Sequence, residues 1–121
     1  KYHDAVLKNP VKAQTLAAQA LKSKDWYMRE AGLKTLVAVN PSKAKFEARS
    51  ILQKDPAMLV RASAVTALKI LKDSESEDVL WKSLEDPRNF RKDQSLWIRP
   101  QIMATLVEFK STRKENFKKF Y

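Results

Sequence analysis

The sequence is poor in the residues on which most catalytic sites depend, with no cysteine, one histidine and one glycine among 121 residues. Without cysteine the chain has no disulfide, no thiol nucleophile and no Cys-ligated zinc. The one histidine, His3, lies close to the first residue, so neither Ser-His nor Cys-His chemistry can be assembled in a folded core. The lone Gly32 excludes a glycine-rich phosphate loop. We therefore expect no catalytic residue, no metal site and no cofactor.

Long apolar runs are also missing. No stretch reaches the ~18 apolar residues that a membrane-spanning helix needs, so we expect no membrane span. The chain begins at Lys1 rather than Met and shows no signal-peptide pattern. This fits a mature or trimmed form, or a boundary chosen within a longer chain. The absence of cysteine suits the cytoplasm as well as a periplasmic or secreted location, so compartment and oligomeric state stay open.

Glycine and β-branched runs are too scarce for an all-β fold, whereas good helix formers such as Ala, Leu, Lys and Glu are abundant. We predict an all-α fold and a single domain over residues 1–121. Asn9-Pro10, Asn40-Pro41 and Asp55-Pro56 each place a capping residue before a proline at the first helical position. With weaker capping signals, these dipeptides predict helices near residues 10–23, 26–39, 41–54, 56–72, 75–85, 95–109 and 112–120.

One pattern occurs three times along the chain. Arg29 opens REAGLKTL, Arg61 opens RASAVTAL and Arg99 opens RPQIMATL. The arginines are separated by 32 and then 38 residues, and two helices fit into each interval. Such a period indicates a helical solenoid. The second interval is longer because DPRNFRKD, residues 86–93, is inserted before the third copy.

These copies resemble HEAT repeats, in particular the short bacterial form of the phycobilisome-lyase type. The family pattern of an Asp, a turn, an apolar-Arg pair and a closing Leu matches at Asp55…Val60-Arg61 and at Asp93…Ile98-Arg99. The first copy departs from it, because Ser23 stands six residues before Arg29. The best match covers residues 25–109. The resemblance implies a right-handed α-solenoid of about three helix pairs.

The resemblance also implies a structural role for the repeated charges. In such repeats the Asp and Arg side chains form a hydrogen-bonded ladder along the turns, and charge-assisted bonds of this kind contribute about 1.5–3 kcal/mol each. The expected ladder residues are Arg29, Asp55, Arg61, Asp93 and Arg99. At the end of the chain, Phe117, Phe120 and Tyr121 stand at i, i+3 and i+4, which predicts a C-terminal capping helix.

Two sets of residues are candidates for partner binding. The resemblance implies that Met28, Val60 and Ile98, just before each repeat arginine, are buried and that the second helices line a concave face, which leaves a row one residue earlier near its rim. That row and its neighbours are Tyr27, Lys34, Leu59, Trp97 and Gln101. It forms either a recognition stripe or an inter-repeat packing contact. The second set is the basic insert, Arg88, Phe90, Arg91 and Lys92, which is either a contact for phosphate, peptide or acidic protein or a solvated loop.

The net charge of +10 is concentrated at the two ends of the chain, while residues 25–85 are nearly balanced. A groove for nucleic acid would want a cation on every second helix, but the matching positions Lys34, Thr66 and Ala104 hold only one. We therefore expect a non-catalytic protein-interaction or scaffolding module whose partner is a protein or peptide segment, an acidic one included. The alternative is a basic module that binds nucleic acid. Glycosylase activity through Asp93 and Trp97 is disfavoured, because Asp93 already belongs to the ladder.

Overall fold

The computed structural model describes residues 9–89 and 95–109, which form six α-helices and two short 3-10 helices. The helices are α2 (Pro10–Leu21), α3 (Trp26–Val39), α4 (Pro41–Lys54), α5 (Met58–Ile70), α6 (Glu77–Glu85) and α7 (Ser95–Glu108), with η1 at Ser74–Ser76 and η2 at Pro87–Asn89. The predicted capping helix at 112–120 lies outside these residues. No helix in the described ranges combines the length and the apolar character that crossing a membrane requires.

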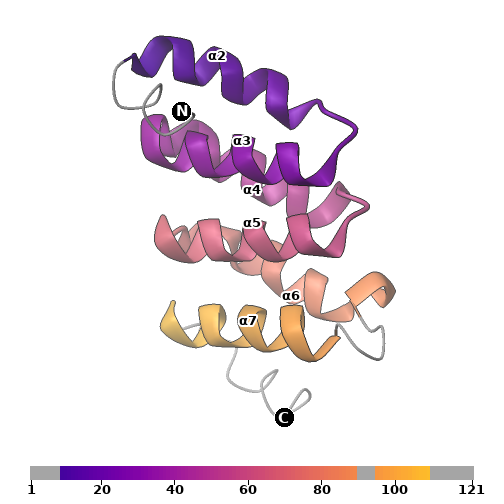
Figure 1. The fold of residues 1–121 in the computed structure, drawn as a ribbon. Coiled ribbons are helices and arrows are strands. Elements are labelled where there is room, and N and C mark those ends of the chain that lie inside the picture. Colours follow the sequence, from indigo (N-terminus) through magenta and orange to yellow (C-terminus); the bar gives the residue numbers. More distant parts are fainter. Residues whose placement is uncertain (1–8, 90–94, 110–121) are drawn as a thin grey trace.

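The helices form three antiparallel pairs, α2–α3, α4–α5 and α6–α7. Figure 1 shows the second helices of the pairs, α3, α5 and α7, one above another in a single layer, with α4 and α6 behind them. We call α3, α5 and α7 the second-helix layer. The predicted all-α solenoid of helix pairs is therefore confirmed.

One buried cluster extends from α3 to α7, and a smaller one joins α2, α3 and α4 through Ala17, Leu36 and Ala44. Leu33 of α3, Leu52 of α4 and Leu68 of α5 belong to the same buried cluster as Leu84 of α6 and Leu106 of α7. The first pair packs more closely, through small residues. A Cβ added at Gly32 would lie 2.9 Å from the carbonyl oxygen of Ala17 and 3.0 Å from the Cβ of Ala20. Because real Cβ contacts are longer than this, only glycine lets α2 and α3 approach so closely.

Two of the three predicted Asx-Pro helix starts are confirmed. Asn9 accepts a hydrogen bond from the amide of Lys12 at 3.1 Å, and Asn40 accepts one from the amide of Lys43 at 3.2 Å, so each caps the helix that begins at the following proline.

The third start, at Asp55-Pro56, is wrong, because α5 begins only at Met58. The Asp55 carboxylate accepts the amide of Ala57, two residues on, at 2.9 Å. This is an Asx-turn, which holds the chain outside the helix.

The predicted burial of the residue before each repeat arginine is correct at Val60 and Ile98, which are both 0% exposed, and wrong at Met28, which is 39% exposed. Val60 lies in the middle of the stack, between α3 and α7. Met28 belongs to the first pair, where the close approach of α2 is made further along α3, at Gly32. The first turn of α3 is therefore left accessible.

Candidate functional site

The turns between paired helices are joined by the repeat arginines. Arg29 binds the Asp55 carboxylate of the next pair through two bonds, from Nε at 2.7 Å and from Nη2 at 3.0 Å. Its Nη1 donates to the backbone carbonyls of Ser23 at 3.1 Å and Lys24 at 3.0 Å. The hydrogen bond to Asp55 raises the pKa of Arg29, and burial opposes the rise. Arg29 therefore ties its own turn to the turn of the next pair.

Arg61 repeats this geometry in the second pair and is 2% exposed. Its Nη1 donates to the backbone carbonyl of Asp55 at 2.7 Å, again six residues earlier in the chain. Toward the third pair, Nε donates to Oδ1 of Asn89 at 3.1 Å and Nη2 to the carbonyl of Arg88 at 3.3 Å. Arg61 thus binds the backbone carbonyl of Asp55, whereas the carboxylate of Asp55 binds Arg29. The expected contact of Asp93 with Arg99 lies outside the described residues.

A matching contact at the other edge of the stack escaped the sequence analysis. Arg49 of α4 binds the buried Asp73 through two bonds of 2.7 Å. Its pKa is raised first by this hydrogen bonding, against the effect of burial. Arg49 lies outside the repeated octapeptide, and its partner is 24 residues away. No short-range pattern could have indicated the pair.

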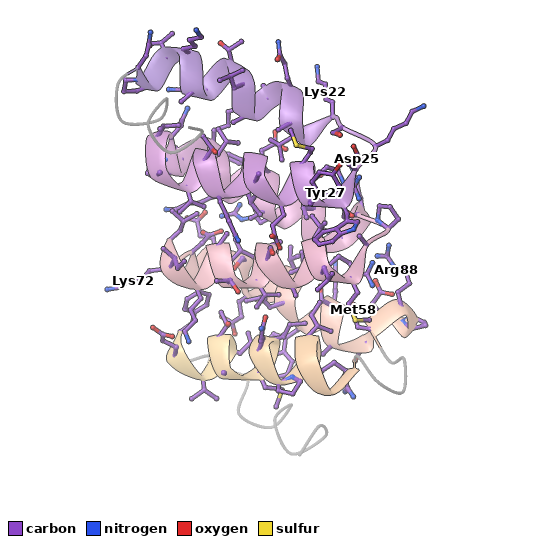
Figure 2. The ribbon with its side chains drawn as sticks, viewed as in Figure 1. Lys22, Asp25, Tyr27, Met58, Lys72 and Arg88 are labelled. Atoms are coloured by element: carbon purple, nitrogen blue, oxygen red, sulfur yellow. The ribbon has the colours of Figure 1, made fainter. Side chains whose placement is uncertain are left out.

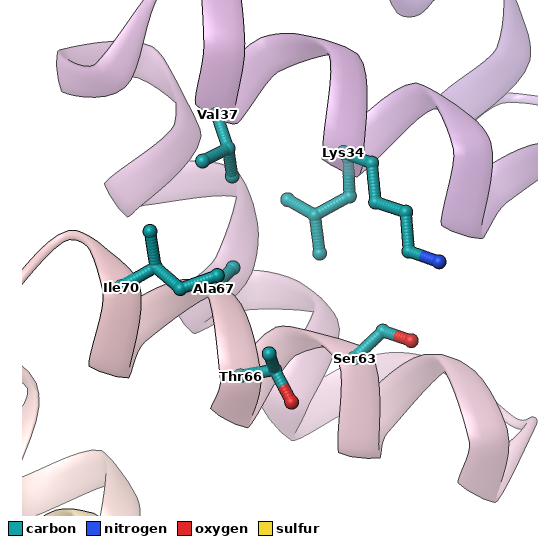
Figure 3. A pocket seen from close by; sticks show the side chains of 7 residues that line it. Lys34, Val37, Ser63, Thr66, Ala67 and Ile70 are labelled. Carbon is teal, nitrogen blue, oxygen red and sulfur yellow. The ribbon is translucent and has the colours of Figure 1, made fainter.

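A groove of about 370 Å³ lies between α3 and α5, on the second-helix layer. Figure 3 shows side chains of the two helices facing each other across it, with Val37 and Ile70 at one end and Lys34 and Ser63 at the other. The full lining is Leu33, Lys34, Val37, Ser63, Thr66, Ala67 and Ile70. The groove exists because α5 presents the small side chains of Ser63, Thr66 and Ala67 toward the larger ones of α3.

The polar end of the groove is closed by one carboxylate. Glu30 of α3 accepts a short hydrogen bond from the Ser63 hydroxyl of α5 and pairs with Lys34, whose Nζ lies 3.4 Å from Oε1. Both carboxylate oxygens are thereby occupied. The apolar end is open, because Ile70 is 62% exposed. The groove can therefore accept apolar groups at one end and an anionic group beside Lys34.

The concave row continues beyond the polar end of this groove. Tyr27 of α3 is 55% exposed and Leu59 of α5 is 38% exposed. Both stand in the first turns of their helices, and Figure 2 shows Tyr27 at the edge of the molecule opposite Lys72. Tyr27 packs edge to face with Trp26 at a centroid distance of 5.9 Å. Its hydroxyl donates to Asp25 at 3.2 Å, and the charge of Asp25 raises the pKa of Tyr27.

The third copy of the row is only partly described. Trp97 lies in the first turn of α7, and its side chain falls outside the described residues. Gln101 lies on α7 with intermediate exposure. The structure therefore brings Tyr27, Leu59 and Lys34 to one side of neighbouring helices, while the sequence analysis missed Val37, Ser63, Thr66, Ala67 and Ile70.

The model of the family described as HEAT repeats matches residues 13–98, well over half of the chain. The chain belongs to the HEAT-repeat family. Neither a curated protein nor a solved structure matches it. The match starts 12 residues before the predicted limit of 25 and therefore includes most of α2.

In this HEAT-repeat chain, the basic insert is partly engaged in holding the stack together. Arg88 binds Asp86, with Nη2 lying 2.7 Å from Oδ2, and also donates to the backbone carbonyl of Gln53. The hydrogen bond from Arg88 is the main cause of the lowered pKa of Asp86. Buried Asn89 donates to the carbonyl of Ser83 at 2.8 Å while it accepts from Arg61. The other insert residues, Phe90, Arg91 and Lys92, lie outside the described part of the chain.

Exposed cations are distributed unequally over the two layers of the HEAT-repeat stack. On the described side chains of α3, α5 and α7, the exposed lysines are Lys34 and Lys69, and each has an acidic partner on the same layer. The first helices of the pairs and the connecting turns hold a larger set, Lys12, Lys22, Lys24, Lys43, Lys54, Lys72, Lys82 and Arg88. Within residues 9–89 and 95–109, no three His, Asp or Glu side chains are grouped so that they could hold a metal ion.

Proposed function

We propose that this HEAT-repeat chain is a non-catalytic protein-interaction module that holds a segment of a partner protein on its second-helix layer. HEAT repeats commonly serve as interaction and scaffolding modules. The observation that carries the proposal is the groove between α3 and α5, because it offers open apolar surface beside a few fixed polar groups. Sites that bind peptides and other ligands usually combine these two features.

The length of the layer suits a short segment. Tyr27 and Val37 are ten residues apart on α3, which corresponds to about 15 Å along the helix axis. A partner helix of three turns, or about five extended residues, would reach from the exposed row at Tyr27 and Leu59 to the apolar end at Ile70. Aromatic side chains such as Tyr27 frequently anchor such contacts.

The distribution of charge disfavours the alternative of nucleic-acid binding. A strand lying along the second-helix layer would need cations at matching positions on successive helices. Thr66 and Ala104 occupy the positions matching Lys34 on the next two helices, so this position carries a cation on α3 and not on α5 or α7. The second-helix layer therefore lacks the continuous row of cations that a nucleic-acid backbone would need.

Site-specific photocrosslinking tests the proposal. A photoreactive amino acid replaces Thr66 in the groove and, as the matched control, the exposed Asp78 on α6 in the opposite layer. In extracts of the native source, we expect protein adducts from position 66 that Tyr27→Ala and Trp97→Ala variants reduce roughly tenfold. Adducts that survive both variants but vanish when Arg88, Arg91 and Lys92 are substituted would place the site at the basic insert instead.

A further inference from the structure

We propose that the segment held between α3 and α5 is acidic, with a large apolar side chain seated between Val37, Ala67 and Ile70 and a neighbouring carboxylate bound by Lys34. This inference rests on the proposed function and specifies the chemistry of the partner at the same groove. It commits to a polypeptide that carries both features within one or two helical turns.

The apolar end of the groove is the reason for proposing a large apolar side chain in the partner. Val37 and Ile70 face each other there, with the small Ala67 between them (Figure 3). The volume of about 370 Å³ lies in the range of roughly 300–1,000 Å³ that ligand sites occupy. Covering the exposed Ile70 with an apolar side chain removes apolar surface of both partners from water, which is the main source of affinity available at this end.

The charges around the groove are the reason for proposing an acidic residue in the partner. The only carboxylate that reaches the groove from the described residues of α3 and α5 is Glu30, and its two oxygens are already bound by Ser63 and Lys34. A cation of the partner would therefore compete with Lys34 for this one carboxylate. Lys34 has three ammonium donors, and its bond of 3.4 Å to Glu30 leaves the ammonium able to bind a second carboxylate.

A second cation stands at the apolar end. Lys72 follows Ile70 by two residues and extends outward where α5 ends (Figure 2). Lys69 nearby is paired with Glu108 at 3.6 Å. The net charge of +10 attracts an acidic segment at long range, while Lys34 and Lys72 bind it at the groove.

Selection from a displayed library of random peptides of about twelve residues, long enough to follow α3 from Tyr27 to Val37, tests this chemistry. We expect the enriched peptides to share an apolar residue with Asp or Glu within four positions. Their affinities are then measured by fluorescence anisotropy against variants of the protein. Lys34→Glu should weaken binding roughly tenfold, because it replaces an attraction by a repulsion.

Each variant has a matched control. Ile70→Ser removes exposed apolar surface from the groove and should weaken binding roughly tenfold, whereas Val107→Ser makes the same change at a 54% exposed position on α7 and should have no effect. Lys82→Glu on α6 is the control for Lys34→Glu. Lys72→Gly should weaken binding about threefold without loss of stability, because Lys72 has a φ of 53°, where glycine is favoured.

The outcomes separate this inference from the proposed function. Enriched peptides that lack acidic residues but depend on Ile70 would overturn the inference and leave the proposed function standing. Peptides indifferent to both Ile70 and Lys34, or a selection without enrichment, would overturn both. The inference would also be overturned by a single-stranded oligonucleotide that displaces the peptides and whose affinity depends on Lys34 more than on Ile70. The groove would then bind phosphate groups rather than an acidic polypeptide.

Discussion

Replacement of Arg61 by methionine should destabilise the fold more than the loss of any other cation on α5. Arg61 is 2% exposed, and its guanidinium donates to the backbone carbonyl of Asp55 at 2.7 Å, to Oδ1 of Asn89 at 3.1 Å and to the backbone carbonyl of Arg88 at 3.3 Å. Methionine fills a similar volume but donates to none of these acceptors. The short bond to Asp55 contributes about 1.5–3 kcal/mol and the two longer ones about 0.5–1.5 kcal/mol each.

These values are already net of the water contacts that donor and acceptors lose on folding, and the apolar packing of methionine recovers part of the loss. We expect the free energy of unfolding to fall by about 2–4 kcal/mol. Urea unfolding followed by far-UV circular dichroism measures the change, and the slope of the transition reports whether the variant still unfolds in one step. The slope matters here because stacked repeats can unfold separately.

Lys69→Met is the matched control, since it also replaces a cation by methionine on α5. Lys69 is exposed and pairs with Glu108 at 3.6 Å, so the change should cost less than about 0.5 kcal/mol. If Arg61→Met costs no more than this control, the bonds between the turns contribute nothing to stability and the proposed structural role of Arg61 is wrong.

Three further predictions follow from the packing, the ion pairs and the charge. Gly32→Ala should destabilise the chain by about 1–3 kcal/mol in the same unfolding assay, because the added Cβ would lie 2.9 Å from the carbonyl oxygen of Ala17; an unchanged or raised stability would show that α2 can shift freely. Arg88→Gln should destabilise the fold at neutral pH by an amount that shrinks toward about pH 2, because the lowered pKa of Asp86 stabilises the folded state only while that carboxylate is ionised. A pH-independent difference would contradict this account. Duplex DNA should bind weakly, and its affinity should fall steeply between about 50 and 200 mM salt in anisotropy titrations, whereas tight binding that persists at about 200 mM salt would reopen the nucleic-acid alternative.

The sequence indicated the architecture well because that information is local and repeated. Each pair contributes its own apolar stripe, and the Asn9-Pro10 and Asn40-Pro41 starts depend only on neighbouring residues. The first residue of α5 could not be predicted from neighbouring residues in the same way. The carboxylate of Asp55 is held by Arg29, 26 residues earlier, and a local capping signal does not report so distant a partner.

The groove was beyond the reach of the sequence for a related reason. Tyr27 and Lys34 could be assigned to the concave side from the phase of the repeat, but the cavity depends on how far apart α3 and α5 lie. That separation is set by the small residues Ser63 and Ala67 facing Leu33. In the sequence these residues look like ordinary positions of an Ala-rich helix.

The contact that Arg29 and Arg61 each make with a backbone carbonyl six residues earlier has a consequence for how such chains change over generations. Arg29 reaches the carbonyl of Ser23 in the same manner as Arg61 reaches that of Asp55. Every amino acid supplies a backbone carbonyl, so mutation of the residue at that position leaves this bond available. The side chains of the turns can therefore change while the hydrogen bond between the arginine and the turn is kept. A motif definition that requires aspartate six residues before the arginine would overlook true repeats.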